Sequence, residues 1–93
     1  MPTYRTLLDA KTAISENICN LNNVLTSIKS DAGFIIFVQE QALAQIEKSP
    51  LLFRQLDFPY ALRNNVTIAK FAVGKDGLNF ARCGADAKAS LSA

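Results

Sequence analysis

Two cysteines and two glutamates are the side chains best suited to chemistry in this sequence. Cys19 has the nucleophilic group of a cysteine enzyme, but the chain contains no histidine, and no cation lies at helical spacing to activate the thiol. Glu40 and Glu47, seven residues apart, would share one helix face as an acid pair. We favour plainer interpretations, in which Cys19 is an inert small side chain and the glutamates are solvated helix surface. The sequence therefore indicates no catalytic residue, and we predict that the protein is not an enzyme.

The motifs of metal and nucleotide sites are also missing from the sequence. Two separated cysteines, Cys19 and Cys83, without a CxxC pair or histidine, do not make a zinc site, and the acids are too scattered for calcium. The four glycines form neither a GxGxxG fingerprint nor a P-loop. We expect no metal and no cofactor, and we interpret both cysteines as reduced thiols.

The C-terminal third has a mild excess of positive charge. Residues 59–93 hold five basic and two acidic side chains. The candidate nucleic-acid contacts are Arg63, Lys70, Lys75 and Lys88, with Arg82 as the fifth basic residue of the group. On a hairpin these cations could follow a phosphate backbone, which makes a dimeric nucleic-acid-binding regulator the alternative function. Because the charges are spread thinly, we favour a solvated surface.

The N-terminal stretch carries the strongest pattern in the chain. A heptad seam recurs at alternating spacings of three and four through Tyr4, Leu7, Lys11, Ile14, Ile18, Leu21, Leu25 and Ile28. A continuous helix over residues 3–29 would be roughly 40 Å long at about 1.5 Å per residue. A compact chain of this size has a diameter of roughly 32 Å. We therefore expect the seam to be an interface with another chain.

Two features leave alternatives open within this seam. The run from Asn20 to Asn23 is where the helix would break, because asparagine is a poor helix former, although the apolar phase continues through it. Lys11 is the one charged residue in the stripe. It either extends to water with its stem packed, or fixes the register of a low-order oligomer as polar core residues do in coiled coils.

The rest of the chain predicts an α+β fold that is mostly helical. We expect a second helix over residues 34–48 that forms an αα-hairpin with the first, with residues 34–38 as a possible buried strand, and a short third helix over 50–56. Residues 67–73 and 78–83 flank a Gly-Lys-Asp-Gly turn and predict a C-terminal β-hairpin. No internal repeat is evident. Residues 1–84 are expected to form a single domain, and residues 85–93 a loose tail.

The composition fits a small binding module. The 93 residues carry a net charge of +2 and are 49% hydrophobic, which suits one modest core. No signal peptide or membrane-spanning run is present, so a cytoplasmic location and no membrane contact are expected. We predict a non-enzymatic regulatory protein that forms a homodimer and binds a protein partner through its first helix. An inhibitor of a larger complex, of the kind made by mobile elements, is a further alternative.

Overall fold

The computed structural model describes residues 3–92, which fold into six α-helices and three 3₁₀ helices. In chain order they are α1 (Leu7–Glu16), η1 (Ile18–Asn23), α2 (Thr26–Lys29), α3 (Ala32–Lys48), η2 (Pro50–Arg54), α4 (Tyr60–Arg63), α5 (Val66–Lys75), η3 (Gly77–Arg82) and α6 (Ala85–Ser92). Within this part of the chain, the one β-type pairing is an isolated bridge between Tyr4 and Val24. The predicted α+β class is therefore wrong, because the described fold is helical throughout.

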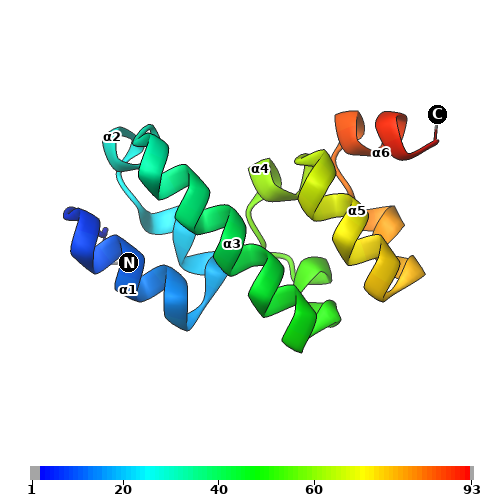
Figure 1. Ribbon diagram of the computed structural model, residues 1–93, viewed down its shortest axis with the longest axis horizontal. Coiled ribbons are helices and arrows are strands. Elements are labelled where there is room, and N and C mark those ends of the chain that lie inside the picture. The colour runs from blue at the N-terminus through cyan, green and yellow to red at the C-terminus, as the bar shows by residue number, and fades with distance from the viewer. Residues whose placement is uncertain (1–2, 93) are drawn as a thin grey trace.

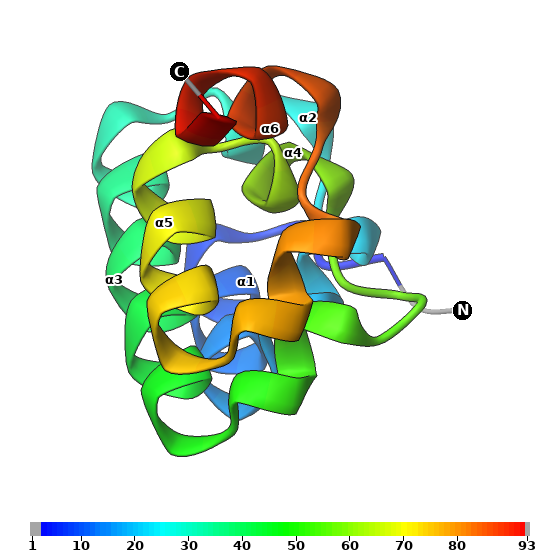
Figure 2. The ribbon, with the colours of Figure 1, turned by 90° about the vertical axis from the view of Figure 1, so that its right-hand side faces the viewer.

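The same succession of elements occurs three times. Each unit has a longer α-helix, then a 3₁₀ helix, then a short α-helix: α1–η1–α2, α3–η2–α4 and α5–η3–α6. Figure 1 shows α1, α3 and α5 in a row, running in the same sense, and Figure 2 shows α2, α4 and α6 together at the upper end. The molecule is elongated, at 38 × 22 × 21 Å. The units are thus stacked along the long axis, as in helical repeat proteins.

Matching hydrogen bonds show that the first and third units are structural copies. Asn20 donates from Nδ2 to the carbonyl of Ala13 at 2.8 Å, and Asn79 donates in the same way to Ala72 at 2.9 Å. Both asparagines lie seven residues beyond their acceptor, and the two pairs are separated by the same 59 positions. The asparagine in each case ties the 3₁₀ helix to the end of the preceding α-helix.

The same offset recurs at the short connections before α1 and α5. The amide of Leu25 donates to the carbonyl of Tyr4 at 3.3 Å, and the amide of Gly84 donates to Arg63 at 2.9 Å. Residue types also agree at Ala10/Ala69, Lys11/Lys70, Ala13/Ala72, Asn20/Asn79 and Lys29/Lys88. An internal repeat is therefore present, although the sequence pattern did not indicate one.

Helix α3 is the central element of the stack. It has 17 residues, against 10 in α1 and 10 in α5, and both of those helices pack on it. Each long helix has a completely buried alanine seven residues before its C-cap residue: Ala10, Ala42 and Ala69. A methyl side chain at these matching positions allows the close approach of neighbouring elements, which positions the larger core side chains around them.

The predicted continuous helix over residues 3–29 is wrong, because the chain leaves the helix at Asn17. That residue is extended, at φ −158° and ψ 121°, and its side chain accepts from the amide of Cys19 to start η1. Asn20 and Asn22 then bond backbone carbonyls, Asn22 reaching both Cys19 and Asp57. Asparagine side chains that compete for backbone groups end the helix, and they do so three residues before the run at Asn20–Asn23.

The predicted C-terminal β-hairpin is also wrong, because residues 66–75 form helix α5 and residues 77–82 form η3. Asn65 caps α5 by accepting from the amide of Ile68 at 3.1 Å. Asp76, expected in the hairpin turn, instead accepts from the amide of Leu78 at 3.0 Å and starts the 3₁₀ helix. The alternating pattern was misleading because a short apolar run satisfies both periods.

The remaining predictions concern the second helix, the short third helix and the C-terminal tail. Helix α3 covers the helix predicted over residues 34–48, so residues 34–38 are helical. It forms no αα-hairpin with α1, because η1 and α2 intervene and the two helices run in the same sense (Figure 1). The short third helix is present as η2, which ends at Arg54. In place of the expected loose tail, residues 85–92 form α6, with Ala87 fully buried.

Candidate protein-interaction surface

A small apolar pocket opens between α2, α4 and the first half of α3. Its volume is about 240 Å³. The lining is mostly aliphatic and aromatic, with a few polar side chains: Leu21, Lys29, Phe34, Ile35, Val38, Gln39, Ala61, Leu62 and Asn65. The adjoining helices α2 and α3, Leu21 of η1 and the region around α4 therefore create it, and α3 contributes the largest share.

The first two turns of α3 position the apolar side chains of this surface. Asp31 caps the helix by accepting from the amide of Phe34 at 2.8 Å. Phe34 and Val38, one turn apart, then point into the core and are buried, whereas Ile35 and Ile36 stay 44% and 59% exposed. Helix α3 is longer than α1 and α5, and these first two turns belong to its additional length. Neither neighbouring helix therefore extends far enough to cover both isoleucines.

The size of the pocket decides what it fits. Sites for drug-sized ligands and cofactors commonly measure about 300–1,000 Å³, so a pocket of about 240 Å³ lies below that range. A single large apolar side chain from another protein fits better. Lys29, Gln39 and Asn65 supply polar groups among the lining residues, in keeping with the polar rims of protein interfaces.

A wider groove of about 820 Å³ lies between α3 and α5. Leu43 and Phe71 contribute apolar surface to it from opposite sides. Lys75 also lines the groove, but its ammonium group lies 5.2 Å from the centre of the Phe71 ring and pairs with Glu47 of α3. The ion pair joins the second unit to the third, whereas the cation–π contact lies within α5. The groove is therefore a seam between units that the ion pair crosses.

The two cysteines are poorly placed for nucleophilic chemistry. Burial, together with the negative charge of Asp57, raises the pKa of the Cys19 thiol to about 11. Burial also raises the pKa of Cys83. Because the thiolate is the reactive form, both side chains are protonated at neutral pH. Glu40 is exposed, as we expected for both glutamates, and Glu47 pairs with Lys75. Residues 3–92 contain no cluster of potential metal ligands.

The residues of the predicted seam do not share one surface. Ile14, Ile18 and Leu21 are buried in the chain's own core. The remaining members are partly or largely accessible: Tyr4, Leu7, Lys11, Leu25 and Ile28. They lie on α1 and α2 or shortly before these helices, because the first helix ends at Glu16. The Lys11 ammonium group lies 5.5 Å from the centre of the Phe37 ring, so its nearest aromatic partner belongs to its own chain.

The predicted nucleic-acid contacts are not gathered into one basic patch. The Arg63 guanidinium donates to the carbonyl of Gln55 and lies 5.9 Å from the centre of the Phe58 ring. Burial and the nearby charge of Arg82 lower the Arg63 pKa. Lys75 is held by Glu47, and Lys88 is half-buried in α6. Lys70 and Lys75 are the exposed members of the four, and both line the groove between α3 and α5.

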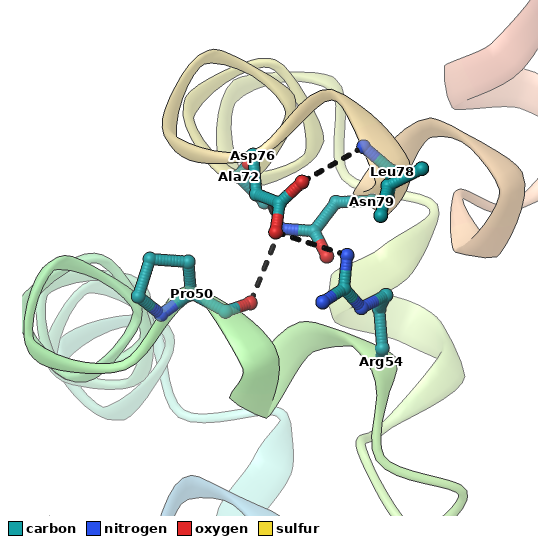
Figure 3. A network of polar contacts seen from close by, with 6 residues as sticks. All are labelled: Pro50, Arg54, Ala72, Asp76, Leu78 and Asn79. Carbon is teal, nitrogen blue, oxygen red and sulfur yellow. Dashed lines mark hydrogen bonds and ion pairs between the residues drawn. The ribbon is translucent and has the colours of Figure 1, made fainter.

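Sequence reasoning gave no indication that Ile35 and Ile36 are exposed. It also missed the role of Asn79, the one fully buried polar residue among those described. Figure 3 shows the Asn79 amide pointing toward Pro50, between η2 and the end of α5. The sequence does contain one signal of the internal repeat. Asn20 follows Ala13 by the same number of residues as Asn79 follows Ala72, and these pairs mark equivalent positions in the first and third units.

Within the described residues, no helix combines the length and the apolar character needed to cross a bilayer. Comparison with known proteins gives no relative: no family model, no curated protein and no solved structure matches this chain.

Proposed function

We propose that this chain is a small, non-enzymatic protein-interaction module that binds a protein partner through the surface over the first half of α3. The observation that carries the proposal is the pair of exposed isoleucines, Ile35 and Ile36, beside an apolar pocket of about 240 Å³. Adjacent exposed apolar side chains around a pocket are typical of binding sites, because isolated ones are common but clustered ones are costly in water.

The partner is expected to anchor one large side chain in the pocket. Ile35 lines the pocket and Ile36 follows it in the chain, so an aliphatic or aromatic residue of the partner would be flanked by apolar surface. Burying such a side chain contributes about 1.5–3 kcal/mol. Lys29 in the lining favours a partner that carries an acidic residue next to its anchor, since opposite charges steer association.

Affinity capture with a matched control tests this proposal. The full chain, Ile35→Asp and the control Leu56→Asp are immobilised and exposed to a lysate of the source cells, and the bound proteins are identified by mass spectrometry. Leu56 is 88% exposed and does not line the pocket, so its substitution controls for the added charge. Support is a protein that the unmodified chain and the control retain and Ile35→Asp loses. Identical sets of bound proteins for all three would refute the proposal.

A further inference from the structure

The contacts between the second and third units define how successive units join. We call the side of a unit toward the preceding unit its front face, and the other side its back face. Asn79, on the front of the third unit, donates to the carbonyl of Pro50 at 3.1 Å. Beside it, Arg54 pairs with Asp76 at 3.0 Å (Figure 3). The join therefore combines one buried amide with an ion pair.

The back face of the third unit lacks such a cover in the described chain. Each unit has an apolar residue at the fourth position of its 3₁₀ helix. These matching residues are Leu21, Phe53 and Phe80. The first two are 8% and 0% exposed, whereas Phe80 is 36% exposed. Leu78 is 71% exposed, and a Cβ added at Gly77 would meet no atom within 4 Å. An apolar position that is covered in two units is therefore open in the third.

The front face of the first unit carries the group that fits this open end. Asn20 matches Asn79, and its Nδ2 donates to Ala13, while the described residues supply no acceptor for its second hydrogen. Gly77 in turn matches Pro50, because each is the first residue of its 3₁₀ helix. A unit stacked in the usual way would thus bring the amide of Asn20 to the carbonyl of Gly77.

Glu16 marks where an incoming first unit would make contact. Asp9 and Glu16 line a polar hollow beside α1, and Glu16 matches Lys75, which forms an ion pair across the second join. Glu16 of an incoming copy would therefore lie inside the new contact, where a change of its charge is expected to disturb docking.

We infer that the occupant of the back face is a second copy of this chain, docked through the front face of its first unit. The contact is heterologous, because it joins two different surfaces, and it leaves one free end of each kind. Association therefore continues beyond a dimer as the concentration rises. This self-association does not depend on the pocket over α3.

Sedimentation equilibrium over a range of protein concentration tests the inference. The weight-average mass of the full chain is expected to rise above 10.1 kDa with concentration. Glu16→Lys disables the front face and is expected to weaken association roughly tenfold or more. Gly77→Trp blocks the back face at a place with open space. Glu40→Lys makes the same charge change as Glu16→Lys on exposed α3 surface and is expected to associate like the unmodified chain.

Mixing the two disabled variants distinguishes head-to-tail joining from its alternatives. The Gly77→Trp copy retains an intact front and the Glu16→Lys copy an intact back, so the mixture is expected to form one dimer and nothing larger. A symmetric back-to-back dimer would instead leave Glu16→Lys fully dimeric alone and the mixture without gain. That outcome, or a monomer at all concentrations of the full chain, overturns the inference. Ile35→Asp is expected to associate normally, which separates this result from the proposed function.

Discussion

Replacement of Asn79 by alanine tests the join between the second and third units. The side chain is fully buried, and its Nδ2 donates to Ala72 at 2.9 Å and to Pro50 at 3.1 Å. Two such hydrogen bonds contribute about 1–3 kcal/mol, and the space left by the amide adds to the loss. Oδ1 is buried without a partner among the described residues, so its removal returns roughly 1 kcal/mol. We expect Asn79→Ala to lower the free energy of unfolding by about 2–3 kcal/mol.

Asn20→Ala is the matched control for this change. Asn20 occupies the equivalent position but is only partly buried and donates to one carbonyl, that of Ala13. Its loss is expected to cost about 0.5–1.5 kcal/mol. In thermal unfolding followed by circular dichroism, Asn79→Ala should lower Tm by roughly 10–20 °C and Asn20→Ala by less than about half of that. Equal shifts for the two variants would refute the role given to the contact with Pro50.

Three further perturbations have defined outcomes. Gly84→Ala is expected to lower the free energy of unfolding in urea by about 1–3 kcal/mol, because a Cβ there would lie 2.5 Å from the Asn64 side chain. Gly74→Ala, in open space within α5, is expected to raise the same free energy by about 0.5–1 kcal/mol. The opposite order of stability would contradict the packing. Because the pKa of Cys19 is raised, the folded thiol keeps its proton between about pH 9 and 11, whereas the unfolded thiol loses it. The contribution of Cys19 to the free energy of unfolding is therefore complete below about pH 9. It falls as the pH rises above that value, by at most about 1.4 kcal/mol per pH unit. Cys19→Ala should remove that slope in urea titrations at several pH values, and an unchanged slope would be inconsistent with it. Asp31→Ala removes the cap of α3 and is expected to cost about 0.5–2 kcal/mol by the same measurement, with no cost if the cap is unimportant.

The sequence predicted the second half of the central helix and left residues 34–38 open between helix and strand, although two signals favour a helix throughout. Asp31 stands at the start of the helix, and good helix formers alternate with apolar residues through Lys48. The first helix failed because its heptad phase continues across Asn17, where the chain turns into a 3₁₀ helix that keeps Ile18 and Leu21 facing inward. Periodicity records which side chains are buried, but it does not record whether one helix or two elements bury them.

The candidate site was less predictable than the core. Ile35 and Ile36 belong to an apolar run that also contains buried Phe34, and composition does not distinguish the two environments. Their exposure depends on α3 extending beyond its neighbours, which is a property of the assembled stack. The same holds for the hairpin expected around Asp76, since that carboxylate caps η3 only because α5 ends beside it. Both errors arose where tertiary packing overrides a local pattern.

The position of α3 between α1 and α5 has a consequence for how the molecule opens. In a linear array each unit is stabilised by its immediate neighbours, so an outer unit that detaches loses one interface, whereas a central unit would have to lose two. Amide hydrogens of α6 are therefore expected to exchange with solvent earliest and those in the middle of α3 last. The molecule would then unfold from its two ends inward, and α3 would be the last helix to unfold.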